Sequence, residues 1–192
     1  GSSVSISGTG NDAVAIIGAK GDDSSKGAAY IFDKSDGSWT EIAKLVASDG
    51  ANGDEFGYSV SISGTGNDAV AIIGAYIDDS SKGSAYIFDK SSGSWAQIAK
   101  LVASDAANGD RFGVSVAISG TGNDAVAIIG AEYDDSYKGS AYICDKSDGS
   151  WTEIEKLVAS DAASFKIFGN SVSIYGTGNN AVAIIGAISD DE

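Results

Sequence analysis

The chain has 192 residues, with 27 acidic against 12 basic side chains and no histidine. Its 43% hydrophobic and 20% charged residues are typical of a globular chain. The formal charge of −15 disfavours nucleic acid and anionic membrane surfaces as partners, because both attract clustered lysine and arginine. The missing histidine excludes a histidine-based catalytic triad and a histidine-ligated zinc site. No apolar run is long enough to span a membrane.

A repeat of 56 residues accounts for the whole chain. The segment SVSISGTGNDAVAIIGA begins at Ser3 and returns, almost unchanged, at Ser59, Ser115 and Ser171. A second segment, which begins KGAAYIFDK at Lys26, returns twice at the same spacing. The chain therefore forms a single array of about three and a half units. The units are residues 1–56, 57–112 and 113–168 and the half-unit 169–192.

Each full unit contains four strand-like segments. In the second unit, residues 59–63 alternate serine with valine and isoleucine, and residues 69–74 form a short apolar run. Residues 85–89 are rich in aromatic and β-branched side chains. Residues 95–102 would also fit one face of a helix, but their length and the turn before them favour a strand. We therefore predict an all-β fold, a β-propeller-like array of four-stranded antiparallel blades.

The turns between these segments carry a recognisable signature. Phe56-Gly57 precedes the first strand of a unit, Gly74-Ala75 ends the second, and an acidic loop then leads to G-S-A-Y-I-F. The combination resembles the FG-GAP repeat, the blade of the integrin α-subunit β-propeller. It is more similar still to the bacterial and algal variety with an S-W-x-x-x-x-K-L-x-A-S-D strand. The resemblance implies a non-enzymatic extracellular or cell-surface module for adhesion or assembly.

Two departures from the family pattern bear on cofactors. The loop between the first two strands reads G-T-G-N-D, whereas many integrin blades carry a D-x-D-x-D-G calcium loop there. One carboxylate cannot replace the six to eight oxygens that calcium prefers, so we predict no cofactor and no metal site. The proline of the family's Gly-Ala-Pro is also absent. Its positions are occupied by Lys20, Tyr76, Glu132 and Ile188.

Aspartate pairs follow the second strand of every unit, in a loop that should share one face of the array with the loops between units. Aspartate favours turns and keeps loops solvated, which is the simpler interpretation. The alternative is a surface for a divalent ion, a protein ligand or, with neighbouring rings, a carbohydrate. The candidate ligand or partner residues are Asp22, Asp23, Asp78, Asp79, Asp134, Asp135, Tyr76 and Tyr133, and the half-unit adds Asp190 and Asp191.

Other recurring residues indicate packing. Trp95 recurs as Trp39 and Trp151 on the fourth strand, which favours contact between neighbouring blades. Cys144 replaces the phenylalanine of the other units, so we expect a small buried apolar group that no base activates. No acid–base pair or activated nucleophile can be assembled, and we predict that the protein is not an enzyme.

The last half-unit differs from the others. Its leading loop reads A-S-F-K-I where the others read A-N-G-D-E or A-N-G-D-R, and Tyr175 replaces a serine. Sequence drift explains these changes as well as a contact with a neighbouring chain does. Phe165, Ile167 and Tyr175 are the candidate assembly residues.

An open array of this kind would expose sheet faces and edges. Two copies nearly supply the seven units of a propeller ring, but joining them sets strands of the same phase against each other. We expect completion by other copies or by sequence outside this segment, and head-to-tail contacts that do not close would produce a filament. The alternatives to an adhesion module are therefore a structural subunit of an extracellular filament and a lectin-like propeller.

Overall fold

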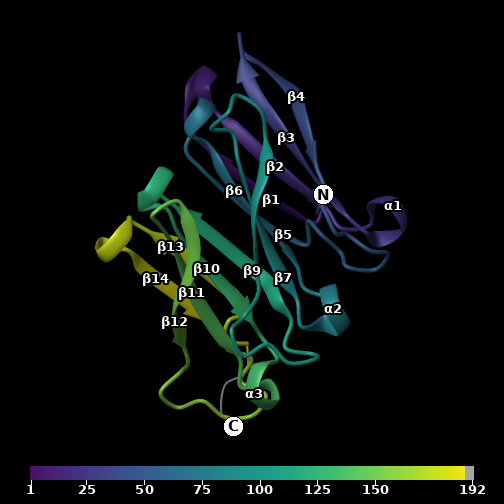
Figure 1. The fold of residues 1–192 in the computed structure, drawn as a ribbon, viewed down its shortest axis with the longest axis vertical. Helices are drawn as coiled ribbons and strands as arrows, with labels where there is room; N and C mark the ends of the chain where they lie inside the picture. The colour runs from purple at the N-terminus through teal and green to yellow at the C-terminus, as the bar shows by residue number, and fades with distance from the viewer. Residues whose placement is uncertain (189–192) are drawn as a thin grey trace.

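The computed structural model describes residues 1–188 and confirms the all-β prediction (Figure 1). Three four-stranded sheets and one two-stranded sheet are antiparallel, and in each sheet neighbouring strands follow one another in the chain. The first sheet contains β1 (Ser3–Ser7), β2 (Val14–Ala19), β3 (Ala28–Ser35) and β4 (Ser38–Leu45). The second contains β5 (Ser59–Ser63), β6 (Val70–Ala75), β7 (Ser84–Asp89) and β8 (Ala96–Leu101). The third contains β9 (Phe112–Ser119), β10 (Val126–Ala131), β11 (Ser140–Ser147) and β12 (Ser150–Leu157), and the last contains β13 (Ser171–Tyr175) and β14 (Val182–Gly186).

Short helical turns connect the strands, and the sequence did not predict them. Between the second and third strands lie α1 (Asp22–Ser25), α2 (Asp78–Ser81) and α3 (Asp134–Tyr137). Between the first and second strands lie the 3-10 turns η1 (Gly10–Asp12), η2 (Gly66–Asp68), η3 (Gly122–Asp124) and η4 (Gly178–Asn180). None of these turns, within residues 1–188, approaches the length of a membrane-crossing helix.

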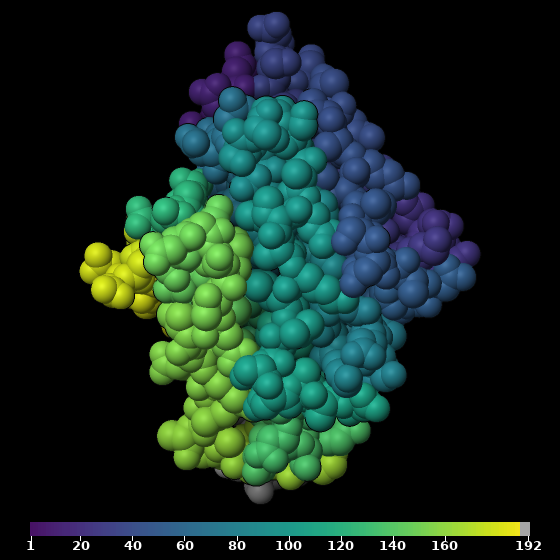
Figure 2. Space-filling model, viewed as in Figure 1, coloured from purple at the N-terminus to yellow at the C-terminus, as the bar shows by residue number. Residues whose placement is uncertain are grey.

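The sheets pack in chain order, and their first strands β1, β5, β9 and β13 contact one another in succession. Figure 2 shows the units following one another across the molecule, from purple and blue through teal and green to yellow. Serines on these strands link neighbouring sheets. The hydroxyl oxygens of Ser3 and Ser5 accept hydrogen bonds of 3.2 Å from the backbone N–H groups of Val60 and Ile62. The backbone N–H of Ile118 on β9 donates in the same way to Ser61 on β5, so the serine faces of β1 and β5 each hydrogen-bond to the next first strand.

Glycines of the repeated signature allow the sheets to approach this closely. A Cβ on Gly74, at the end of β6, would overlap the carbonyl oxygen of Gly113, the second residue of β9. A Cβ on Gly83 would likewise overlap the carbonyl oxygen of Phe112. The Phe-Gly pair thus rests on backbone of the preceding sheet at positions where any side chain would prevent the contact.

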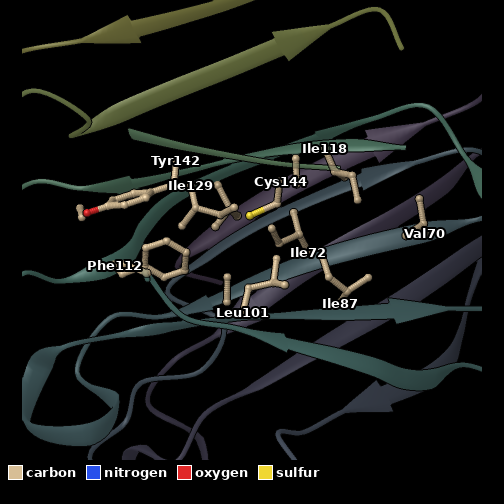
Figure 3. Packing of buried hydrophobic residues seen from close by; sticks show 14 residues of the cluster. Val70, Ile72, Ile87, Leu101, Phe112, Ile118, Ile129, Tyr142 and Cys144 are labelled. Atoms are coloured by element: carbon tan, nitrogen blue, oxygen red, sulfur yellow. The ribbon is translucent and has the colours of Figure 1, made fainter. Parts of the chain in front are cut away.

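The hydrophobic core lies between sheets. Figure 3 shows Ile72 and Ile87 of the second sheet facing Ile129, Tyr142 and Cys144 of the third. A matching cluster joins the first and second sheets. Burial raises the pKa of the Cys144 thiol to about 12, which fits its expected role as a small apolar group.

The predicted packing of the tryptophans is confirmed for two of the three. Trp95 and Trp151 pack against the clusters that join their own sheet to the preceding one. The expectation is wrong for Trp39, whose side chain is 43% exposed because no sheet precedes β4 within the described residues. Trp95 also lies one residue before β8 and not on it.

Replacement of Trp95 should reveal this packing. We expect Trp95→Ala to lower the free energy of unfolding by about 3 kcal/mol, because the variant leaves a cavity between two sheets. Trp39→Ala is the matched control and should cost much less. Chemical denaturation of both variants measures the difference, and equal losses would contradict the assignment.

Candidate functional site: the loop face and the two open ends

The three α turns and the loops that precede β5, β9 and β13 form one surface, which we call the loop face. The backbone N–H of Glu55 donates a 2.9 Å hydrogen bond to the carbonyl of Ser25. The backbone N–H of Arg111 donates an equivalent bond to the carbonyl of Ser81. These bonds bring each acidic turn beside the loop that leads into the next sheet. They agree with the predicted placement of both kinds of loop on one face.

The first aspartate of each pair belongs to an internal network. Asp78 is buried and lies 2.7 Å from the Lys100 ammonium, and it accepts a 2.6 Å hydrogen bond from Ser84. Tyr86 donates to Asp78 at 3.3 Å and to Asp49, in the loop after β4, at 3.0 Å. Asp78 is thus held by its own sheet and is not free to bind a partner.

The same network recurs in the third sheet with Asp134, Tyr142, Lys156 and Asp105. In the first sheet only Asp22, Tyr30 and Lys44 form it. Asp49 and Asp105 each come from the loop that follows the preceding sheet. The network therefore ties neighbouring sheets together at the loop face.

Charge pairing sets the protonation of this network. Burial alone would raise the pKa of Asp49, but hydrogen bonds from Lys100 and Tyr86 outweigh it and hold the pKa below its usual value. Burial alone would lower the pKa of Lys100, yet Asp49 and Asp78 hold it well above its usual value. The carboxylates and the ammonium therefore stabilise one another in their charged forms.

The second aspartate of each pair is exposed. Asp79 and Asp135 each pair with the lysine three residues later, Lys82 at 2.9 Å and Lys138 at 2.8 Å, and Asp23 pairs with Lys26 at 3.2 Å. These short-range surface pairs leave the outer carboxylate edge accessible to solvent. Asp190 and Asp191 lie outside the described residues.

Rings and cations form a second row across the loop face, which we call the aromatic row. Tyr58 and Tyr76 have ring centroids 4.3 Å apart, and the Arg111 guanidinium lies 5.5 Å from the Tyr76 ring and 4.1 Å from that of Tyr133. Tyr133 then contacts Tyr137 at 4.5 Å. The candidate residues Tyr76 and Tyr133 are therefore half-buried between other groups.

The aromatic row ends at the unusual loop of the last unit. Phe165 stacks on Tyr137 with ring centroids 5.2 Å apart and remains 64% exposed. It occupies the place of Gly53 and Gly109 and keeps their left-handed backbone, with φ of 71°. Ile167 is half-buried, and Tyr175 lies at the far end of β13. The three candidate assembly residues do not share one surface.

The two ends of the array expose apolar sheet faces. On β1, Val4 and Ile6 are 71% and 62% exposed, whereas the equivalent Val60 and Ile62 are 6% and 5% exposed. We call this side of the first sheet the head face. On β14, Val182 and Ile184 are 68% and 71% exposed, whereas the equivalent Val14 and Ile16 are 2% and 0% exposed. We call this side of the last sheet the tail face.

Within residues 1–188, no three carboxylate, histidine or thiol groups converge as ligands for a metal ion. The first aspartate of each acidic turn is instead paired with a lysine and accepts a hydrogen bond from a tyrosine, and Asp54 and Asp110 accept hydrogen bonds from backbone N–H groups of their own loops. The loop face thus presents the exposed carboxylates of Asp79 and Asp135 and the exposed ring of Phe165.

Comparison with known families agrees with this architecture. A model of the FG-GAP repeat matches residues 39–88, 95–144 and 151–192, which together make up most of the chain. The chain belongs to the FG-GAP repeat family. No curated protein matches it. Each FG-GAP match begins at a tryptophan before or on the fourth strand, so the FG-GAP unit runs from one sheet into the next and contains the junction between them.

The Tyr–Lys–Asp network of this FG-GAP array was not identified from the sequence. Its signal is the joint recurrence of Tyr86, Lys100 and Asp49 at the repeat spacing. Tyr86 lies on β7, Lys100 on β8 and Asp49 in a loop of the preceding unit. The strand register pairs Tyr86 with Lys100, and the packing of neighbouring sheets adds Asp49.

Removal of the central ammonium should destabilise the FG-GAP array. We expect Lys100→Met to lower the free energy of unfolding by about 2 kcal/mol, because Asp78 stays buried without its counter-charge. Because the folded pKa of Asp49 lies below its ordinary value of 3.8, its stabilisation exists above that pH and disappears in acid. The difference in the free energy of unfolding between Lys100→Met and the unmodified protein should therefore disappear as pH falls below about 4.

Lys82→Met is the control, since it removes an exposed ion pair on the same turn and should leave the stability unchanged. Denaturation at neutral and acidic pH tests both variants. A loss for Lys100→Met that is independent of pH would contradict the ionic origin of the effect.

Proposed function

We propose that this FG-GAP chain is a non-enzymatic extracellular or surface module that acts by assembly through its open sheet faces. The observation that carries the proposal is the exposure of the head and tail faces. Identical side chains that are almost fully buried between the internal sheets lie open at both ends. Exposed apolar faces of this kind mark interaction sites in soluble proteins.

Two further observations support a role in binding over catalysis. The only thiol is buried and has a raised pKa, and the buried carboxylates of Asp78 and Asp134 are held in ion pairs with Lys100 and Lys156. Units of this family occur in adhesion-type and propeller modules. A structural subunit of an extracellular filament is the form of assembly that an open array favours, because contacts that do not close repeat indefinitely.

Association of the purified chain tests this function. We expect oligomers at micromolar concentration in sedimentation velocity, and growth of these oligomers when sodium chloride is raised from about 0.05 M to about 0.5 M. Salt should strengthen association because each copy carries a net charge of −15, and apolar contacts form once this repulsion is screened. A monomer under all these conditions would refute the proposal.

Carbohydrate binding is a second candidate, favoured by the exposed end of the aromatic row. Phe165 and Tyr137 present stacked rings, and the exposed Asp135 stands two residues before Tyr137 on α3. Sugar rings pack on such surfaces while acidic groups accept their hydroxyl hydrogen bonds.

A glycan array probed with the unmodified chain and with Phe165→Gly tests this candidate. Glycine restores the residue of the other units and suits the left-handed backbone, so the fold is kept. We expect bound glycans to be lost with Phe165→Gly and kept with Tyr175→Ser. The absence of any bound glycan on the unmodified chain would exclude a lectin.

A further inference from the structure

We propose that the tail face of one copy docks on the head face of a second copy and repeats the junction between internal sheets. In this contact β14 takes the place that β2 has inside the chain, and β1 of the second copy takes the place of β5. The inference rests on the proposed assembly function and specifies its partner, its surface and its register.

The two faces are chemically the same as the two sides of an existing junction. β14 reads VAIIG, as does the start of β2, and β1 reads SVSIS, as does β5. Inside the chain Val14 and Ile16 pack in one cluster with Val60 and Ile62. Val182 and Ile184 would meet Val4 and Ile6 of the second copy with the same side chains in the same register.

The polar groups of the two faces also match. Inside the chain Ser3 and Ser5 accept hydrogen bonds from the next first strand. Ser171 and Ser173 hold the equivalent positions on β13 and are exposed. In the docked pair they would accept from the backbone N–H groups of Val4 and Ile6. The contact therefore satisfies edge groups that otherwise face solvent.

Gly186 is suited to the same approach. A Cβ on Gly18, Gly74 or Gly130 would overlap the carbonyl oxygen of the following unit's Phe-Gly glycine. At Gly186 the nearest atom to such a Cβ is Ser171 Cβ at 3.5 Å, so the described residues alone do not require glycine there. A docked copy does require it, because the backbone of Gly1 would occupy the place that Gly57 has inside the chain.

Residue changes in the third sheet suit the half-unit that follows it, because this half-unit contributes only the two strands β13 and β14. Ala43 and Ala99 pack against the internal clusters, but the equivalent position on β12 is the exposed Glu155. Asp49 and Asp105 pair with lysines of the next sheet, whereas Asp161 pairs at 2.9 Å with Lys166 of its own loop. The outer part of this end is thus polar, while the inner tail face stays apolar. Tyr175 extends that face, since it pairs with Val182 in the β13–β14 register.

Complementary blocked variants test the contact. The head-blocked variant is Val4→Lys with Ile6→Lys, and the tail-blocked variant is Val182→Lys with Ile184→Lys. Lysine lowers the net negative charge, so any loss of association cannot come from added repulsion. All four positions are exposed in the chain, and circular dichroism should show an unchanged sheet signal.

We expect each blocked variant alone to be a monomer and their equimolar mixture to form a one-to-one dimer that does not grow. The matched control, Ile98→Lys with Val102→Lys, changes exposed residues on and just after the outer strand β8 and should associate like the unmodified chain. Gly186→Ala should weaken association by about tenfold or more while leaving the melting temperature unchanged. Gly74→Ala changes the equivalent glycine of an internal junction and should lower the melting temperature.

The outcomes separate the two proposals. A monomeric unmodified chain refutes assembly itself. If the unmodified chain associates but a blocked variant alone associates equally well, or the mixture does not form the dimer, assembly stands and head-to-tail docking is overturned. Unchanged association of Gly186→Ala overturns the proposed register.

Discussion

The close approach of backbone between neighbouring sheets is the constraint on which the rest of the array depends. Gly74 and Gly83 leave space for the carbonyl oxygens of Gly113 and Phe112, and the sheets can then bury a continuous apolar layer between them. Serine hydroxyls and the Tyr–Lys–Asp network fix the register of that layer at its inner edge and at the loop face. The Phe-Gly and Gly-Ala signature is therefore a description of one junction, which explains why each family match starts in one sheet and ends in the next.

Local patterns predicted the fold because each strand carries its own signal. The alternation in residues 59–63 and the apolar run after it gave β5 and β6 to within one residue. The ambiguous segment after Trp95 proved to be β8, because it pairs antiparallel with β7 and so alternates between exposed side chains, such as Ile98, and side chains that face inward, such as Leu101. The helical turns α1 to α3 were missed because their second and third residues have left-handed backbone, as Asp79 and Ser80 do, and propensity does not anticipate it.

The candidate site was harder to anticipate, since residue type alone does not distinguish a ligand from a structural pair. Asp78 and Asp79 are adjacent in sequence, yet one is buried under Lys100 and Tyr86 and the other is exposed. Trp39 and Trp95 have nearly the same local sequence, but only Trp95 has a preceding sheet to pack against in the described part of the chain. Asp78 is distinguished by side chains on strands of its own sheet, and Trp95 by the sheet that precedes it. Neither set of contacts is visible in the residues next to it in the sequence.

Near-identity of the units has a consequence for specificity. A junction that forms inside the chain can form between chains with the same atoms, so the internal array and an assembly compete for one kind of contact. In the proposed assembly the few changed residues would decide which ends meet. Glu155 is exposed and Lys166 pairs with Asp161 at the outer edge of the last units, whereas Val182 and Ile184 expose apolar surface on the tail face. The net charge of −15 opposes every encounter between copies, so only a contact that also buries a matched apolar face overcomes it. In the proposed assembly, charge would suppress random association, and the shape of the sheet junction would select head-to-tail docking.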